Sequence, residues 1–265
     1  TGFEVGEGRS ATPILACCGL PVCVHVRTSP CPAFLVADLP LPDLQATVAR
    51  GDPLGDRPVR LIPPLLFLRH AFGAACWHAP RPTARVIIDD PLLRPRYGAL
   101  DVERLHASAR RLGYGATIGF IPWNHRRTAL PSAALFQDPA VLSICVHGCD
   151  HTRDEFAPGD PGLVAPKAVL ALERMATHQA RTGIPCAPVM VFPQGRFSSA
   201  AMAALRAAGY LAAVNSSVFP TDGTGRPLRL ADLLRPAVLY GGFPVFGRRP
   251  LSQPADLALD LFLGK

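Results

Sequence analysis

Leu142-Ser-Ile-Cys-Val-His-Gly-Cys-Asp-His151 is the stretch from which both the fold and a functional site can be predicted. Residues 142–146 are apolar and rich in β-branched side chains, which is typical of a buried strand. His147 stands where that strand ends, and Gly148 allows the backbone to turn. If the turn leads into a helix, His147 and His151 lie on one face, where two imidazoles can bind one divalent metal ion. A surface or core histidine pair is the alternative interpretation.

A second apolar strand is predicted upstream at residues 84–89, and it ends in two adjacent carboxylates, Asp89 and Asp90. Neighbouring residues of a regular strand point to opposite faces, so the strand must end at this pair if both carboxylates serve one site. Pro91 is consistent with such an end. A helix cap or a turn is the ordinary role of an Asp-Asp pair. Because α/β folds gather their sites at the carboxyl ends of strands, the two motifs together predict one site.

Strands and helices alternate from residue 81 onward, which predicts a parallel sheet that is closed or nearly closed. Residues 1–80 are predicted to form a small β-containing region, with strands at 22–26 and 34–38, that packs on the main domain. The other expected strands lie at 84–89, 116–121, 142–146, 189–192, 211–214 and 237–240. Helices are expected after an Asp101 cap, near Ser132, at about 166–181, after a Ser198 or Ser199 cap and at 228–234. An amphipathic tail is expected at 254–262.

At the Asp-Asp and His-x-x-x-His motifs, over about residues 84–215, the sequence resembles the polysaccharide deacetylase (NodB-homology) family of carbohydrate esterases. The resemblance implies an α/β fold, a distorted (β/α) barrel of about seven strands, formed by residues 81–265. The N-terminal extension of residues 1–80 is the candidate for completing it. The resemblance further implies that Asp89 is the general base and that Asp90, His147 and His151 bind one divalent metal. Zinc is expected, with cobalt or nickel as alternatives.

The segment Pro193-Gln-Gly-Arg-Phe197 is placed like the family's third motif. In the family an arginine before the prolines orients the base, and a tyrosine contributes its backbone N–H to the oxyanion. This chain has no arginine there, and Gln194 replaces the tyrosine. Arg196, after the turn, is the predicted partner of Asp89. A solvated or phosphate-binding arginine is the alternative.

The family also has a late histidine that acts as general acid, and this chain has none after His178, which is predicted to lie within a helix. His125, at the predicted end of a strand in Trp123-Asn-His125, is our candidate for the catalytic acid. A merely exposed loop histidine is the alternative.

Substrate contacts are predicted on the loops that follow these strands. Trp123 and Tyr97 have faces that suit a sugar ring, and packing in the core or rim is the alternative. The loop arginines, Arg126 and Arg127 included, can hold a phosphate or a uronate or form a solvated rim. Glu155 is expected either to orient a ligand histidine by accepting a hydrogen bond from it or to cap the turn. The predicted substrate-binding residues are Arg94, Arg96, Tyr97, Trp123, Asn124, Gln194 and Gly195.

Composition bounds the protein class. With 265 residues, 49% hydrophobic and 18% charged, the chain is expected to be globular. The net charge of +7 comes with no Lys/Arg tract, so no nucleic acid partner is predicted. No apolar run of membrane-spanning length and no signal peptide are visible.

Eight cysteines lack paired CxxC spacing and are expected as free thiols in a reducing, cytoplasmic setting. A structural zinc within residues 17–31 is the alternative.

The resemblance at the Asp-Asp and His-x-x-x-His motifs implies a metal-dependent N-deacetylase, an amide hydrolase acting on an acetamido sugar of a polysaccharide or of its activated precursor. Surface polysaccharide biosynthesis is the expected setting. A catalytically impaired barrel that binds glycan is one alternative, favoured by the missing arginine and late histidine. Another metal-dependent hydrolase, for example of phosphate esters, is the second, favoured by the arginine-rich loops.

Overall fold

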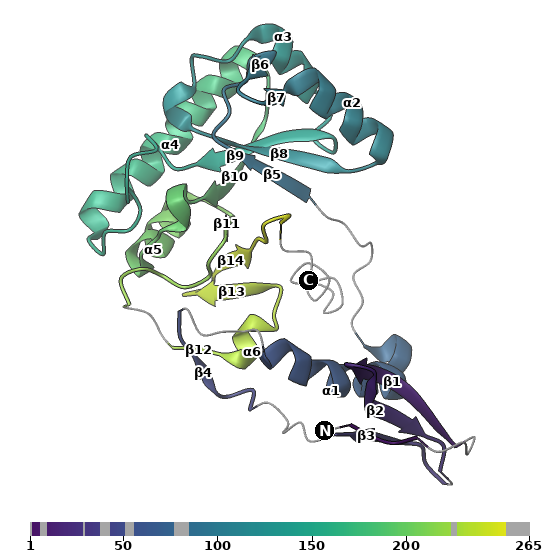
Figure 1. The fold of residues 1–265 in the computed structure, drawn as a ribbon. Helices are drawn as coiled ribbons and strands as arrows, with labels where there is room; N and C mark the ends of the chain where they lie inside the picture. Colours follow the sequence, from purple (N-terminus) through teal and green to yellow (C-terminus); the bar gives the residue numbers. More distant parts are fainter. Residues whose placement is uncertain are drawn as a thin grey trace. The chain divides into compact units, whose positions relative to one another are not determined.

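The computed structural model describes residues 2–5, 10–28, 30–37, 43–50, 56–76, 85–223 and 227–252 (Figure 1). The predicted tail at 254–262 and the first residue of the strand predicted at 84–89 lie outside these ranges. The chain forms two compact units. One comprises Thr1–Pro80 with Arg229–Ala231 and Gly264, and the other comprises Arg81–Leu228, Asp232–Leu263 and Lys265. The packing of residues 1–80 on the main domain stays a prediction.

The first unit contains an antiparallel sheet of β1 (Ala11–Cys17), β2 (Leu20–Val26) and β3 (Ala33–Val36), of which β1 was not predicted. Helix α1 (Asp56–Phe72) runs through both Pro63 and Pro64 and is followed by η1 (Gly73–Ala75). The ring of Phe34 on β3 lies 5.6 Å from that of Phe67 on α1, so these two elements share an aromatic contact. A short strand, β4 (Thr47–Val48), pairs with β12 (Leu228–Arg229).

The second unit is built on a seven-stranded sheet, which confirms the predicted α/β fold class (Figure 1). The sheet has the order β13-β14-β11-β10-β9-β8-β5, and the paired strands are parallel except for the β13–β14 hairpin. The strands are β5 (Arg85–Asp89), β8 (Gly115–Phe120), β9 (Leu142–His147), β10 (Cys186–Val191), β11 (Ala212–Asn215), β13 (Ala237–Tyr240) and β14 (Phe243–Gly247).

The seventh strand corrects one expectation. It is β14, from the end of the chain, and not a strand of residues 1–80. A Gly-Gly turn joins it to β13, and both Gly241 and Gly242 have positive φ angles, of 55° and 86°. Such a two-residue turn matches the twist of an antiparallel hairpin. β14 then lies beside β11 and adds one more carboxyl end to the edge where the predicted site residues gather.

Two helices begin at residues that the sequence predicts as caps. Asp101 caps α2 (Val102–Leu112), Ser198 caps α5 (Ser199–Ala208), and both helices end at a glycine in the left-handed conformation. Helix α4 (Pro161–Thr182) begins five residues earlier than predicted because Asp160 is its cap and accepts a bond from Gly162 N at 2.8 Å. The short elements are β6 (Arg96–Tyr97), β7 (Leu100–Asp101), η2 (Pro122–Asn124), α3 (Leu130–Ala133), η3 (Ala134–Phe136), η4 (Pro193–Gly195) and α6 (Leu230–Leu233).

Buried apolar side chains fill the space between the sheet and the helices, from Phe120 on β8 to Met175 on α4. No described helix has the length and apolarity that crossing a lipid bilayer requires. All eight cysteines are free thiols.

A histidine within this core makes stability depend on pH. His178 on α4 is fully buried, its Nε2 lies 2.8 Å from Thr128 Oγ1, and its ring centroid lies 4.6 Å from that of Phe120. Burial, together with the charge of Arg181 and the nearby His125, lowers the pKa of His178 from 6.5 to about 4. The unfolded chain therefore takes up this proton below about pH 6.5, whereas the folded chain takes it up only near pH 4.

We expect His178 to lower the free energy of unfolding by about 3 kcal/mol as the pH falls from 7 to 4. The contribution of the neutral ring to stability is fully present above the pKa of the unfolded chain and is lost as the pH falls toward the pKa of the folded chain. Urea unfolding at the two pH values measures the loss. In a His178→Phe variant, the difference in the free energy of unfolding between pH 7 and pH 4 should be smaller by that amount. An equal difference in both proteins would contradict the assignment.

Candidate metal centre

The two adjacent carboxylates lie where β5 stops being a strand. Asp89 is the last residue of β5, and Asp90 has a φ of 77° while its backbone N–H donates to Gly119 O at 3.2 Å. Aspartate is among the few residues that tolerate this left-handed conformation. The predicted strand end is confirmed, and the turn at Asp90 breaks the alternation that would send the two side chains to opposite faces.

The two histidines are brought together by a turn, and not by the helix that the sequence allows after Gly148. His147 ends β9, Gly148 and His151 have φ angles of 65° and 60°, and residues 148–160 contain no helix. The ring centroids of His147 and His151 are 5.0 Å apart. A turn with two left-handed residues thus achieves the approach that i and i+4 positions of a helix would have given.

Glu155 fixes this turn. Its side chain is fully buried, and its carboxylate accepts backbone N–H bonds from Cys149 at 2.8 Å, Asp150 at 3.1 Å and His151 at 3.3 Å. Lys167 Nζ lies 3.7 Å from Oε2 and balances the buried charge. Of its two predicted roles, capping the turn is the one for which the structure provides contacts.

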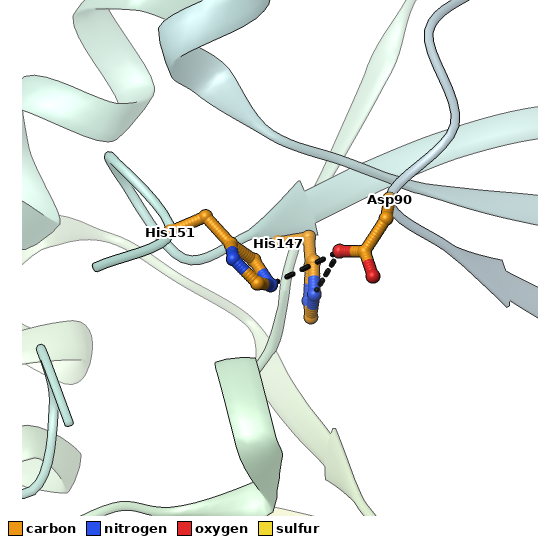
Figure 2. Close-up of side chains that lie close together, drawn as sticks. All are labelled: Asp90, His147 and His151. Carbon is orange, nitrogen blue, oxygen red and sulfur yellow. Dashed lines mark ion pairs between the residues drawn. The ribbon is translucent and has the colours of Figure 1, made fainter. Parts of the chain in front are cut away.

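Asp90, His147 and His151 converge on one point (Figure 2). Asp90 Oδ1 lies 3.0 Å from Nε2 of each histidine, and one ligand atom from each residue falls within 4.8 Å of the others. Metal–ligand bonds of about 2.0–2.1 Å place neighbouring ligand atoms about 2.9–3.4 Å apart. The two measured separations fit that range. Within the described ranges this is the one such group of His, Cys, Asp and Glu, so cysteines 17–31 do not form a second one.

The protonation of His147 also fits a cation at this point. Its Nδ1 donates to Val191 O at 2.9 Å, which leaves the Nε2 lone pair facing the Asp90 carboxylate. Burial lowers the pKa of His147, against the opposing effects of Asp89 and Asp90. A neutral imidazole nitrogen beside a carboxylate oxygen is repelled unless a cation lies between them. Two imidazoles and one carboxylate suit zinc, cobalt, nickel or ferrous iron.

Asp89 has an arginine partner that the sequence did not reveal. Arg248, the residue after β14, donates from Nη1 to Oδ1 at 2.9 Å and from Nη2 to Oδ2 at 2.5 Å. This two-pronged pair holds the carboxylate in one orientation. The predicted partner, Arg196, instead pairs through Nε with Asp154, whose backbone N–H donates to Gln194 Oε1 at 3.3 Å. Arg196 is closer to Asp89 in the sequence, but Arg248 is the arginine that pairs with it.

Gly119 on β8 makes room for the same carboxylate. A Cβ at this position would lie 2.8 Å from Asp89 Oδ1 and 3.5 Å from the Cβ of His147. The pairing of Asp89 with Gly119 across the parallel strands produces this approach. No sequence signal singled this glycine out, because its contact partner is thirty positions away in the chain.

The predicted aromatic and histidine residues after β8 have different surroundings. Trp123 is 60% exposed, and its backbone N–H donates to Cys149 O at 3.0 Å, within the turn between His147 and His151. Asn124 is buried and accepts from Arg127 Nη1 at 3.1 Å. The ring of His125 bonds to Pro122 O at 3.1 Å, and no hydrogen bond or ion pair recorded in the described part of the chain joins it to the three converging side chains.

The remaining predicted contact residues are exposed, except for the half-buried Gly195. Arg96 pairs with Asp101 at 3.5 Å, and neighbouring Arg94 and Tyr97 extend into solvent on the same segment. Gln194 and Gly195 form the turn after β10 with φ angles of 52° and 65°, so the position of this third motif is as predicted. Substrate binding by these residues stays a prediction.

Gly148 offers a test of the turn. It has φ 65°, and a Cβ there would overlap Glu155 Oε1 and lie 2.5 Å from Pro193 Cγ. Gly183 also has a positive φ, of 73°, but its Cβ would have nothing within 4 Å. We expect Gly183→Ala to cost about 1 kcal/mol from backbone strain, and Gly148→Ala about 3 kcal/mol or more, because overpacking adds to the strain. Urea unfolding and metal titration measure both; equal costs would contradict the role of Glu155.

Comparison with known proteins gives similarity of structure only. No family model and no curated protein matches the chain. Among solved structures it is similar to the deacetylase PplD of Streptococcus pyogenes in complex with acetate, with 12% identity, 72% of this chain and 75% of that one covered, and a TM-score of 0.44. It is also similar to IcaB from Ammonifex degensii, with 14% identity, coverage of 76% and 87%, and a TM-score of 0.45.

A CE4 family pseudoenzyme from Bacillus anthracis is similar as well, with 12% identity, coverage of 70% and 62%, and a TM-score of 0.39. With TM-scores below 0.5, these likenesses carry no argument about the site, which is argued from its own geometry.

Proposed function

We propose that this chain is a divergent polysaccharide deacetylase that removes the acetyl group from an acetamido sugar in a metal-dependent reaction. One observation carries the proposal: two histidine nitrogens face one carboxylate oxygen of Asp90, and the adjacent Asp89 is held by an arginine. The first group supplies metal ligands, and the second supplies a fixed carboxylate next to them in the chain. Amide hydrolysis needs this combination of an electrophile-activating site and a base.

The residues divide the work as follows. Asp90, His147 and His151 would hold the ion, which when bound polarises the substrate carbonyl and lowers the pKa of a water molecule. Asp89 accepts two bonds from Arg248, and since a carboxylate has about four lone-pair sites, two remain to take a proton from the attacking water. Arg248 keeps those sites in one direction. Val191 O and Glu155 hold the His147 ring and the turn that carries His151.

The leaving amine must receive a proton. Once it has taken the proton from water, Asp89 can deliver it to the sugar nitrogen as the C–N bond breaks. His125 stays our second proposal for this acid, and its bond to Pro122 O leaves Nε2 as the nitrogen that would donate. A His125→Gln variant separates the two, because only a histidine acid would lose turnover.

Zinc, cobalt or nickel is the proposed ion, a glycan or its activated precursor the proposed substrate, and surface polysaccharide biosynthesis in the cytoplasm the proposed setting. The eight free cysteines support a reducing compartment.

The presence of Arg248 weakens the alternative of a catalytically impaired barrel, because the base has an orienting arginine after all. The phosphate-ester alternative finds little support in Arg96, which is exposed and paired with Asp101.

Acetate release tests the proposal. Purified protein, stripped and then loaded with zinc, cobalt or nickel, is incubated with N-acetylglucosamine and its oligomers, and acetate and free amine are measured. Phosphate release from phosphorylated sugars is measured in parallel. Metal-dependent acetate release is the expected result. Glycan binding without any turnover would favour the impaired barrel, and phosphate release would favour the phosphoesterase.

A further inference from the structure

Two adjacent cysteines lie at the tip of the first hairpin, in the compact unit that does not carry the candidate metal centre. Cys17 ends β1, and Cys18 and Gly19 form the two-residue turn to β2, with φ angles of 50° and 79°. Neighbours in a regular strand point to opposite faces, and this left-handed turn breaks that alternation. Both thiols are exposed, and Cys17 Sγ donates to Cys18 Sγ at 3.9 Å. The hairpin therefore presents two free sulfur atoms side by side to solvent.

The two sulfur atoms are poorly placed to form a lasting disulfide with each other. Adjacent Cα atoms are about 3.8 Å apart across a trans peptide, whereas disulfides usually join Cα atoms about 4.4–6.8 Å apart. A disulfide between neighbouring residues is therefore strained, and strained or exposed disulfides are easily reduced. The pair stays available as a dithiol wherever a thiol reductant is present.

The separation of the two sulfur atoms suits an ion that binds both. Zinc–sulfur bonds of about 2.3 Å in a tetrahedral arrangement place neighbouring sulfur atoms about 3.8 Å apart. The measured 3.9 Å matches that spacing without any movement of the chain. Once one sulfur is bound, the second binds in an intramolecular step, which strengthens binding by about 10²- to 10⁴-fold. The hairpin tip is thus preorganised as a chelate.

The number of protein ligands limits the ions that fit this pair. Within the described part of the chain, no third His, Cys, Asp or Glu extends the pair to a group of three. A bound ion must therefore need only two protein sulfurs, with any other positions filled by small external ligands. Soft ions with a strong preference for thiolate meet this condition, and copper(I), cadmium and trivalent arsenic belong to this class.

We propose that Cys17 and Cys18 form a two-sulfur chelating site for soft, thiophilic metal and metalloid ions. With an organoarsenic(III) oxide, both S–H bonds break and two As–S bonds form. The oxide oxygen leaves as water with the two protons, and arsenic stays trivalent, so the step needs no oxidant or reductant. The site does not depend on the proposed deacetylation, since it shares no residue with the group of Asp90, His147 and His151.

Phenylarsine oxide tests the site on the folded, reduced chain. Intact mass should show one phenylarsine adduct that survives excess 2-mercaptoethanol and is removed by 1,2-ethanedithiol, because only a dithiol competes with a chelate. We expect Cys17→Ser and Cys18→Ser each to weaken binding about 100-fold or more and to lose the adduct. Cys31→Ser is the matched control, another exposed cysteine of the same unit, and should keep it. No adduct on wild type, an adduct kept in Cys17→Ser, or one lost in Cys31→Ser would overturn the proposal.

Cadmium titration separates this site from the candidate metal centre. Thiolate-bound cadmium absorbs in the ultraviolet through sulfur-to-metal charge transfer, whereas the metal centre offers only nitrogen and oxygen ligands. The absorbance should appear in wild type and in Asp90→Ala, and it should be lost in Cys17→Ser and in Cys18→Ser. Absorbance that disappears in Asp90→Ala, or that persists in either serine variant, would contradict a two-sulfur site at the hairpin tip.

Discussion

An Asp90→Ala variant is expected to lose the metal ion and, with it, all measurable turnover. Asp90 supplies the one oxygen that both histidine nitrogens face, each at 3.0 Å. Outer-sphere partners of metal ligands are worth about 10- to 100-fold in affinity, so a direct ligand should cost more than about 100-fold. Metal content after dialysis, and zinc affinity by competition with a chromophoric chelator, measure the loss.

Asp138→Ala is the matched control for this experiment. Asp138 is an exposed carboxylate that accepts a bond from Ala140 N before the start of β9, at the opposite end of the strand from His147. Its removal should leave metal content and turnover unchanged. Undiminished zinc binding in Asp90→Ala would show that the three side chains do not form the site and would remove the basis of the proposed hydrolysis.

An Asp89→Asn variant should retain the metal and still lose about 10²- to 10⁴-fold in kcat, the usual contribution of a general base. Asparagine has nearly the shape of aspartate, but its amide cannot take a proton from water. Metal content equal to wild type, combined with the fall in kcat, is the signature that separates the base from the ligands. Wild-type activity in Asp89→Asn would remove the assigned base.

Arg248→Met is the companion to that variant. It leaves the carboxylate of Asp89 chemically intact but unpaired, so a smaller loss is expected, about 10- to 100-fold. Arg248→Lys should recover little of it, because an ammonium cannot reproduce the two parallel bonds of the guanidinium. Arg196→Met should have no comparable effect, since that residue pairs with Asp154. A larger loss from Arg196→Met than from Arg248→Met would contradict the observed pairing.

The sequence predicted those parts of the site that are coded locally. Each strand end was visible as an apolar run followed at once by polar residues, which is why β5 and β9 and the residues after them were placed correctly. The route by which His151 approaches His147, a turn and not a helix, was not predicted, because a non-glycine residue with positive φ leaves no compositional trace. Helix α4 was placed too late because Pro166 indicated its first turn, whereas the helix begins at Pro161, after the Asp160 cap, and continues through Pro166.

Arg248 shows the limit of local information most clearly. It lies 159 positions from Asp89, in a chain with many arginines, so nothing in its own neighbourhood distinguishes it. Arg248 follows β14, a strand of five residues that contains a proline and ends in glycine, and both residues make a strand hard to predict from the sequence. The Gly241-Gly242 pair between two short apolar runs was the available signal for that hairpin.

The buried carboxylate of Glu155 has a consequence for how the protein would acquire the proposed ion. Because the backbone of residues 149–151 is tied down by a side chain, the loop is ordered by the protein itself. Capture of the cation then pays little conformational entropy, unlike in small domains whose fold depends on zinc. A strong chelator should strip such a protein without denaturing it, and the emptied form should refill at the rate at which ions diffuse in.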